Sequence, residues 1–320
     1  MDKRENFRNA KFGMMLHFGL YSLLGGEWKG QRMPHIAEWA QAYFRIPNSE
    51  YRTLTRAFNP VCFNAEDYVL LAKQAGMKYI VLTSKHHDGF ALFKSKADRY
   101  NSVDMTPFGR DIVAEFAEKC YKHGMKFGLY YSQELDWAHP HGGGYNPPFL
   151  NLDGTTPWTN NWDYPNDAEK DYSICLEEKI IPQMTELLTG YGDLFLMWCD
   201  TAIAINEAQS RRIYELIKHY QPDCMVNSRI GNGMGDYVSA GDNEIPEYKE
   251  YGLLYESPAT LNDSWGYKYY DNNWKTPEQI CKTRDHLASL GANYLLNVGP
   301  DNLGRCQAPA RDILIKVGQM

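Results

Sequence analysis

Polar residues of a few kinds recur at one type of position in this sequence, the end of an apolar run. The clearest case is residues 194–199, an apolar stretch that ends directly on Asp200. The other polar residues at such ends are His17, His86, His87, Arg229, Asp242, Glu256 and Asn297. A set with two or more carboxylates suits cleavage of a glycosidic bond, because one carboxylate can attack or stabilise the sugar carbon while another protonates the leaving oxygen. The histidines and the arginine would then bind sugar hydroxyl groups.

The same histidines raise a second kind of chemistry, metal-assisted hydrolysis. The doublet His86-His87, followed by Asp88, resembles a cluster of metal ligands. Adjacent residues of an extended segment point in opposite directions, however, so the doublet is poorly placed to hold one ion. The His-x-His phrase expected after the first strand of metal-dependent barrel hydrolases is also absent, since His17 is followed by Phe18 and a glycine. We therefore expect hydroxyl-binding histidines, no metal and no other cofactor.

The apolar runs themselves predict the elements that carry these residues. Residues 194–199 show no polar alternation, which is typical of a strand buried on both faces of a parallel sheet or barrel. A helix–glycine–strand phrase occurs twice, at residues 72–83 and 120–131, as a wound parallel sheet produces. The strand candidates are residues 11–17, 77–83, 125–131, 193–200, 224–227, 237–240, 253–255 and 293–298. Eight strands separated mostly by helices predict an α/β fold, a (β/α)8 TIM-like barrel with irregular or missing helices around the fifth, sixth and seventh strands.

A (β/α)8 barrel brings the carboxyl ends of its strands to one rim, where active sites lie. The residues at the strand ends of this sequence would therefore share a single site. Asp200 alone has a simpler interpretation, since an aspartate is a favoured N-cap and a helix is expected to follow it. Thr201 or Asn206 could cap that helix instead. The residues leave both interpretations of Asp200 open.

Composition argues against several classes of protein. Of 320 residues, 43% are hydrophobic and 23% are charged, as in ordinary globular domains. The net charge of −7 and the lack of a basic cluster argue against a nucleic-acid partner. No apolar stretch reaches the length of a membrane span and the N-terminal residues lack a signal-peptide core, so we expect no membrane partner and a cytoplasmic location, or an extracellular or periplasmic one if a leader has been removed. The seven cysteines form no CxxC pair and are expected to be buried free thiols.

Several phrases of the sequence are specific enough to indicate a family. They are KFGMMLHFGLYS, KHHDGF, the strand end Tyr130-Tyr131-Ser132, LMWCD, LNDSWGY and NYLLNVGPDNLGR. Through them the chain, from about Lys11 to its last residue, resembles the retaining α-L-fucosidases of glycoside hydrolase family 29. The resemblance implies an exo-acting enzyme that hydrolyses α-L-fucosides, or closely related α-L-galactosides, through a covalent glycosyl-aspartate. Its partner would be a fucosylated oligosaccharide or glycoconjugate, and a homo-oligomer is left open.

Carried over position by position, the resemblance implies roles for single residues. Asp200, in the LMWCD phrase, matches the nucleophile. The positions implied to bind substrate are His17, Glu38, Trp39, His86, His87, Tyr131, Trp198, Arg229 and Trp265. Family members usually continue into a C-terminal β-sandwich, whereas this chain ends at Met320. We therefore expect one catalytic barrel domain over residues 1–320, without that sandwich, and both a barrel-only protein and a truncated chain stay open.

The acid/base residue is where the sequence departs from the family pattern. Many members carry Thr-Pro-Glu shortly before Ile-Pro, and residues 240–246 read AGDNEIP instead. Aligning on Ile-Pro selects Asp242, which we favour, while Glu256, Glu244 and Glu247 stay open as candidates. The same departure keeps a rival interpretation open, a non-catalytic fucose-binding protein on a glycosidase scaffold. A metal-dependent barrel hydrolase is a second rival.

Overall fold

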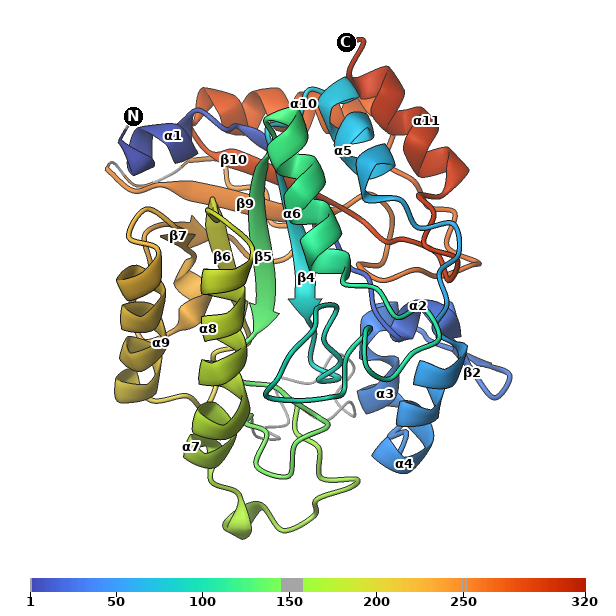
Figure 1. Cartoon of the computed structure of the whole chain (residues 1–320). Coiled ribbons are helices and arrows are strands. Elements are labelled where there is room, and N and C mark those ends of the chain that lie inside the picture. The colour runs from blue at the N-terminus through green and yellow to red at the C-terminus, as the bar shows by residue number, and fades with distance from the viewer. Residues whose placement is uncertain (1, 145–157, 249, 251) are drawn as a thin grey trace.

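The computed structural model of the chain describes residues 2–144, 158–248, 250 and 252–320, and its centre is a sheet of eight parallel strands (Figure 1). The strands are β1 Phe12–Leu16, β4 Tyr79–Lys85, β5 Lys126–Ser132, β6 Leu196–Asp200, β7 Met225–Val226, β8 Val238–Ser239, β9 Tyr255–Thr260 and β10 Asn293–Val298. Their order is β7-β6-β5-β4-β1-β10-β9-β8, and every neighbouring pair is parallel. A parallel bridge between Asn227 and Tyr237 links the two ends of the sheet. The predicted (β/α)8 barrel is thus confirmed, although its β7 and β8 edges are joined by this bridge and a few hydrogen bonds beside it rather than by a longer ladder.

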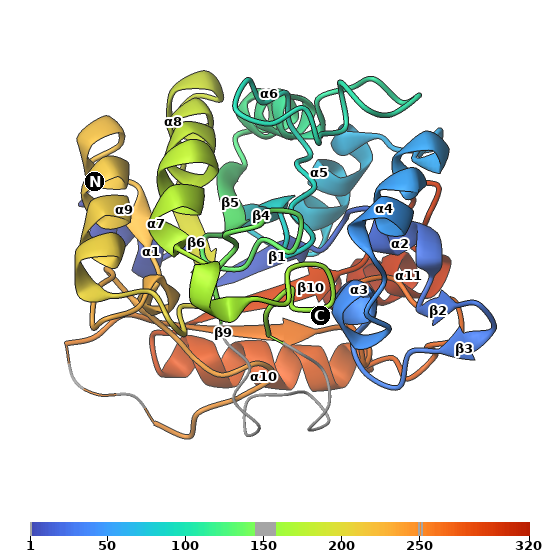
Figure 2. The same cartoon turned by 90° about the horizontal axis from the view of Figure 1, so that it is seen from below.

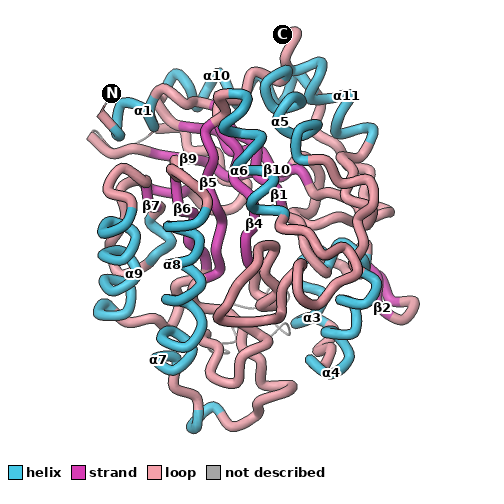
Figure 3. Tube along the Cα trace, in the orientation of Figure 1, coloured by secondary structure: helices cyan, strands magenta, loops and turns pink. Residues whose placement is uncertain are grey.

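Helices surround the sheet on its outer side (Figure 1 and Figure 3). The longer ones are α5 Ala65–Gln74, α6 Ile112–His123, α8 Ile181–Gly190, α9 Glu207–Tyr220, α10 Pro277–Ser289 and α11 Ala308–Val317. The shorter elements are α1 Lys3–Arg8, α2 Tyr21–Leu24, α3 Ala40–Tyr43, α4 Asn48–Tyr51, α7 Tyr172–Cys175, the 3₁₀ turns η1 Ala37–Trp39, η2 Arg52–Ala57, η4 Asp167–Glu169 and η6 Ser228–Ile230, the π turn η5 Leu176–Ile180, and the hairpin of β2 Glu27–Trp28 and β3 Gln31–Arg32. Within the described ranges, only η6 stands between β7 and β8, and no helix stands between β8 and β9. The predicted irregularity around the fifth to seventh strands is therefore confirmed. None of the described helices is both long and apolar enough to span a bilayer.

Helix ends are fixed by the residues that the sequence places there. The Asp111 side chain accepts a backbone hydrogen bond in the first turn of α6, and Gly124, with φ of 63°, ends that helix just before β5. Helix α9 begins at a capping box formed by Asn206 and Gln209. Because Asn206 caps this helix, Asp200 is not its cap, and the simpler interpretation of Asp200 is wrong.

The barrel interior and the layer between barrel and helices hold two separate apolar clusters. The interior cluster includes Met15, Tyr79, Val81, Tyr130, Leu196, Trp198, Met225 and Leu295. Gly13 lies opposite Tyr79 in the β1–β4 pair, and a Cβ at this position would lie 2.4 Å from the Tyr79 ring. A glycine is required here because the tyrosine ring fills the space. All seven cysteines are free and five are buried, as predicted, whereas Cys62 is exposed and Cys306 is half-buried.

The seventh strand starts and ends later than predicted. The sequence pattern indicated a strand over residues 253–255 with Glu256 at its tip, whereas β9 begins at Tyr255 and continues through Pro258 to Thr260. Proline has no N–H to donate and usually stands at strand edges. Pro258 faces the β8 side of β9 beyond the last residue of β8, because its carbonyl accepts a hydrogen bond from the Asn243 N–H. The β8–β9 ladder has already ended at this point, so the missing N–H of Pro258 breaks no ladder bond. Glu256 pairs with the first residue of β10 and therefore lies at the base of the barrel, not at its rim.

Candidate active site

A pocket opens among the strand ends, at the end of the barrel that Figure 2 shows face on. About 300 Å³ of space, part of it open to solvent, lies between its walls. Its lining residues are Met15, His17, Ile36, Glu38, Trp39, His86, His87, Tyr130, Trp198, Asp200, Arg229, Asp242 and Trp265. A wider groove, with about 1560 Å³ of space including solvent-open space, lies at the other end of the barrel around Tyr121 and Phe195, and contains none of the residues selected from the sequence. The rim pocket is therefore identified as the candidate site by the chemistry of its lining residues and not by its size.

The strand ends deliver most of the predicted residues to this pocket. They are His17 after β1, His86 and His87 after β4, Trp198 and Asp200 on β6, Arg229 on η6, Asp242 after β8 and Trp265 after β9, joined by Glu38 and Trp39 from η1. Asn297, on β10, lies behind this wall, and its Oδ1 lies 2.7 Å from Nδ1 of His17. The structure thus brings together residues that are far apart in the sequence.

Asp200 is the last residue of β6 and lies at the inner wall of the pocket. Its Oδ2 accepts a hydrogen bond of 2.8 Å from the Tyr130 hydroxyl, and Nε2 of His87 lies 3.8 Å from the same oxygen. Its Oδ1 accepts a bond of 3.2 Å from Nη1 of Arg229. The side chain keeps an exposure of 15%, so a carboxylate oxygen can still reach a ligand in the pocket. A carboxylate held by a cation and a hydroxyl, but open on one side, is suited to act as a nucleophile.

Arg229 connects the two carboxylates of the pocket. Its Nη1 binds Asp200, while its Nη2 donates 2.5 Å to Oδ1 of Asp242 and 3.0 Å to the carbonyl of Ala240. The guanidinium also stands 4.7 Å above the Trp198 ring, where a cation is attracted to the aromatic face. Burial alone would lower the pKa of Arg229, but Asp200 and Asp242 raise it above its usual value. One permanent cation therefore holds two carboxylates close together.

Three histidines line the pocket as neutral rings. Burial lowers the pKa of His17 to about 4 and holds the pKa values of His86 and His87 well below their usual range. Nδ1 of His87 is fixed by the Ser132 hydroxyl at 2.7 Å, whereas Nδ1 of His86 has no hydrogen-bond partner among the described residues. A buried ring nitrogen without a protein partner fits a ligand hydroxyl group. No three His, Cys, Asp or Glu side chains converge as metal ligands in the part of the chain that the structure describes.

The His86-His87 doublet corrects one argument made from the sequence. The two ring centroids lie 4.0 Å apart and both rings line the same pocket, so the prediction that they point in opposite directions is wrong. Alternation holds only in an extended strand, and these residues follow β4 in a turn.

Glu38 adds a carboxyl group of a different kind to the pocket. It is buried, and its Oε2 accepts a hydrogen bond of 2.8 Å from the Gly266 N–H. Burial raises the pKa of Glu38 to about 8, so the group is mostly protonated at neutral pH and can donate a hydrogen bond. Trp39 and Trp265 stand beside it as aromatic walls, against His87 and His17 respectively, with ring centroids 5.0 Å and 5.2 Å apart.

Glu256, the strongest competitor of Asp242 for the acid/base role, does not line the pocket. It lies inside the barrel and accepts hydrogen bonds from the Tyr79 hydroxyl (2.6 Å), the Trp198 indole (2.9 Å) and the Tyr237 hydroxyl (3.3 Å). Burial raises its pKa to about 7. Trp198 lines the pocket and Glu256 does not, so the carboxyl group of Glu256 is not placed in this structure to transfer a proton directly to a substrate.

Glu244 and Glu247 lie in the loop that carries Asp242. Oε2 of Glu244 accepts a hydrogen bond of 2.8 Å from the Gly241 N–H, and both glutamates are exposed. Neither lines the pocket, whereas Asp242 does. Of the four carboxyl groups that the sequence offers as the acid/base, Asp242 is therefore the one placed beside Asp200.

Tyr131 does not line the pocket, in contrast to the prediction. Its hydroxyl donates 2.8 Å to Oε1 of Gln183 on α8, on the outer side of the barrel. Tyr130, its neighbour, points inward and reaches Asp200. Side chains alternate along a strand, and Tyr130 is paired in register with Trp198, which lies two residues before Asp200 and so faces the same way. Side-chain alternation, followed in steps of two residues from Asp200 once β5 and β6 are aligned, is the signal that would have selected Tyr130.

A small pocket at the rim of a parallel barrel, with two carboxylates on one guanidinium, neutral imidazole rings and aromatic walls, is the kind of site that (β/α)8 barrels use to cleave glycosides. The sequence model of one family, described as Alpha-L-fucosidase, matches residues 1–320. The chain therefore belongs to the α-L-fucosidase family.

Curated relatives agree with this assignment. The tissue alpha-L-fucosidase of Mus musculus is 28% identical over 98% of this chain and 68% of its own length. A putative alpha-L-fucosidase of Caenorhabditis elegans is 27% identical over 98% of this chain and 64% of its own length. The chain thus spans about two thirds of the length of these relatives.

Solved structures provide a closer comparison. Alpha-L-fucosidase AlfC from Lactobacillus casei, in complex with α-L-fucose product, is 50% identical with a TM-score of 0.95, covering 100% of this chain and 98% of that chain. A D200A mutant of AlfC is solved with 4-nitrophenyl-α-L-fucopyranoside at 49% identity and a TM-score of 0.95, covering 100% of this chain and 98% of that chain. The α-L-fucosidase of Vibrio sp. strain EJY3 is 36% identical with a TM-score of 0.90, covering 99% of this chain and 54% of that chain.

Proposed function

We propose that this chain hydrolyses α-L-fucosides, or the closely related α-L-galactosides, with retention of configuration at the sugar carbon. The observation that carries the proposal is the Arg229 guanidinium, which binds Asp200 and Asp242 at the wall of one pocket. A retaining glycosidase needs two carboxyl groups roughly 5–5.5 Å apart, one to attack and one to transfer a proton, and a shared guanidinium places two carboxyl groups in one pocket here. Membership of the α-L-fucosidase family and the fucose-containing ligands of AlfC support fucose as the sugar.

The proposed reaction has two displacement steps. In the first, an Asp200 oxygen attacks the anomeric carbon while protonated Asp242 gives its proton to the leaving oxygen, which breaks the glycosidic bond and leaves the sugar as an ester on Asp200. In the second, Asp242 takes a proton from water, the water oxygen attacks the same carbon, and Asp200 leaves as a carboxylate. Two inversions at one carbon give overall retention.

The remaining groups of the pocket are assigned to the sugar. Neutral His17, His86 and His87 can each donate or accept a hydrogen bond with a hydroxyl group, and protonated Glu38 can donate one. The indole rings of the pocket supply faces for the apolar side of the sugar. The natural substrate would be a fucosylated oligosaccharide or glycoconjugate.

A panel of nitrophenyl glycosides tests the proposed function. We expect turnover of the α-L-fucoside, weaker turnover of the α-L-galactoside, and NMR detection of α-L-fucose as the first product. Turnover of unrelated sugars alone, or first formation of β-L-fucose, would contradict the proposal. Fucose binding by calorimetry without any turnover would favour the non-catalytic binding protein, and loss of activity in EDTA with stoichiometric bound zinc would favour the metal-dependent hydrolase.

A further inference from the structure

One buried side chain joins the main chains of two pocket residues. Gln133, directly after β5, is fully buried. Its Oε1 accepts a hydrogen bond of 2.6 Å from the Asp200 N–H, and its Nε2 donates 3.0 Å to the Arg229 carbonyl. Both ends of the amide are therefore used, and each partner belongs to a different element, β6 and η6.

We propose that Gln133 is a positioning residue for the reaction, which fixes the Asp200 carboxylate relative to the Arg229 guanidinium by holding the main chain of both residues. Gln133 does not line the pocket and is not assigned any contact with substrate. The inference rests on the proposed function of Asp200 as the nucleophile.

The sheet alone does not supply this link. The ladder between β6 and β7 ends at the Met197–Val226 pair, three residues before Asp200. The Asn227 side chain continues the connection by exchanging two hydrogen bonds of 2.9 Å with the main chain of Cys199. At Asp200 itself the connection to the β7 side is made by the amide of Gln133.

The backbone after Asp200 also has to be held. Thr201 has φ of 61°, in the left-handed region that a β-branched residue rarely adopts, so its surroundings must fix it. The Glu134 carboxylate accepts hydrogen bonds of 2.6, 2.8 and 3.1 Å from the N–H groups of Ile203, Ala204 and Ile205. Two consecutive side chains of one loop thus hold the main chain at and just beyond Asp200.

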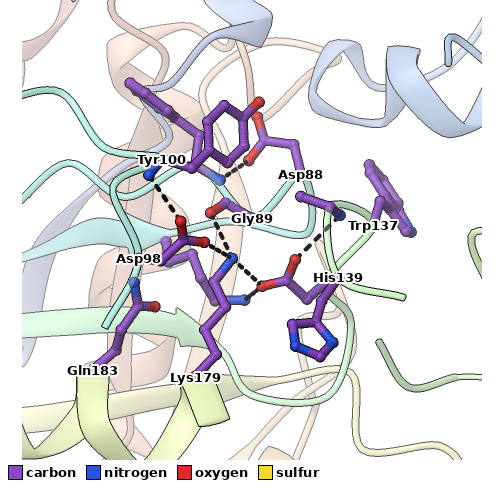
Figure 4. Close-up of polar contacts among 12 residues, drawn as sticks. Asp88, Gly89, Asp98, Tyr100, Trp137, His139, Lys179 and Gln183 are labelled. Atoms are coloured by element: carbon purple, nitrogen blue, oxygen red, sulfur yellow. Dashed lines mark hydrogen bonds and ion pairs between the residues drawn. The ribbon is translucent and has the colours of Figure 1, made fainter. Parts of the chain in front are cut away.

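This loop is itself anchored by a buried ion cluster (Figure 4). Asp136 lies within 3.1 Å of Nζ of Lys85 and 2.8 Å of Nζ of Lys179. Nζ of Lys179 also lies 2.8 Å from Oδ2 of Asp98 and donates a hydrogen bond of 3.2 Å to the Gly89 carbonyl. Figure 4 shows both contacts. Burial alone would raise the pKa of Asp136, but Lys179 and Lys85 lower it below its usual value, so the anchor is ionic. A rigid loop is what a positioning residue requires.

The first test compares two matched glutamine variants. Gln133→Met keeps the length of the side chain and removes both hydrogen bonds, and we expect kcat on 4-nitrophenyl α-L-fucoside to fall about 10²-fold, as for a misplaced reacting group, with KM changed less than about threefold. Gln183→Met is the control, because Gln183 is equally buried and has two hydrogen bonds, to Tyr131 and Ser95, outside the pocket. Gln183→Met should lower the melting temperature similarly and keep kcat.

The second test uses azide in an Asp200→Ala background. Azide replaces the missing carboxylate as nucleophile, so adding Gln133→Met should change the azide-dependent rate less than about threefold, because the positioned group is gone. If Gln133→Met does not fold, Gln133→Asn gives the same comparison, since its amide is one methylene shorter and reaches only one partner.

Three results would overturn the inference alone: equal kcat losses in Gln133→Met and Gln183→Met, a loss confined to KM, or an azide-dependent rate that falls as steeply as the normal rate. A wild-type chain that turns over no fucoside would instead overturn the proposed function, and the inference with it.

Discussion

Asp200→Ala is expected to lower kcat/KM for 4-nitrophenyl α-L-fucoside by about 10⁴-fold or more, the scale seen when an enzyme loses its nucleophile. Among the residues that the structure describes, no other pocket group is assigned this role. Glu38 is mostly protonated at neutral pH because burial raises its pKa to about 8, and Asp242 is assigned to proton transfer. Steady-state kinetics on the purified variant, with circular dichroism to confirm folding, would measure the effect.

Azide and a matched aspartate make this result specific. Azide should restore part of the activity of Asp200→Ala and yield fucosyl azide, because a small anion can attack the sugar carbon from the vacated position. Asp111→Ala is the control. Like Asp200, Asp111 accepts a hydrogen bond from a tyrosine hydroxyl, that of Tyr191 at 2.8 Å, but Asp111 caps α6 outside the pocket. It should lose about 1 kcal/mol of stability and no activity. Retention of more than a tenth of the wild-type activity by Asp200→Ala would contradict the assignment.

Asp242→Ala is expected to separate substrates by their leaving groups. An acidic leaving group such as 2,4-dinitrophenol needs no proton, so kcat/KM for its fucoside should fall less than about tenfold. For a fucoside of a sugar or an alkyl alcohol, kcat/KM should fall about 10²- to 10⁴-fold. The physical basis is the position of Asp242, 2.5 Å from Arg229 and with a side chain 47% exposed at the pocket mouth, where a leaving group would depart. The ratio of kcat/KM values across a leaving-group series measures this separation.

Two control variants distinguish the acid/base role from a structural one. Glu244→Ala, in the same loop but outside the pocket, should leave both kinds of substrate unchanged. Glu256→Gln should lower kcat/KM for both kinds of substrate by the same factor, because Glu256 holds the Trp198 indole and touches no substrate. Equal losses for both kinds of substrate in Asp242→Ala would show that Asp242 only supports Arg229.

The strands and the rim were predictable because their signals are local. A run such as residues 194–199 is apolar without alternation, which requires burial on both faces, and the residue that follows it must then lie at the rim. The placement of Asp200, His17 and Arg229 in one pocket follows from that rule. Distinguishing Asp200 from a helix cap needed the structure, because only the observed capping box shows that Asn206 has that role.

The wrong predictions for Glu256 and Tyr131 share a different origin, namely register between elements. Glu256 appeared to be a strand tip because Pro258 obscures β9, and its depth depends on pairing with β10. Tyr131 and Tyr130 are equivalent in sequence until the pairing of β5 with β6 decides which one faces inward. The role of Gln133 depends on a side chain that bonds to the main chain of residues 67 and 96 positions away, for which one sequence contains no pattern.

Covalent trapping is the sharpest test of Asp200 as the nucleophile. An activated 2-fluoro fucoside should inactivate the wild-type enzyme with release of one leaving group per chain, because the fluorine slows both oxocarbenium-like steps while the activated leaving group keeps formation of the glycosyl-enzyme fast. Tandem mass spectrometry of the peptide that contains residues 198–201 should then place the added fluorofucosyl mass on Asp200, and Gln133→Met should slow the labelling. A label on any other residue, or continued turnover of fucosides with no covalent label, would contradict the proposed mechanism.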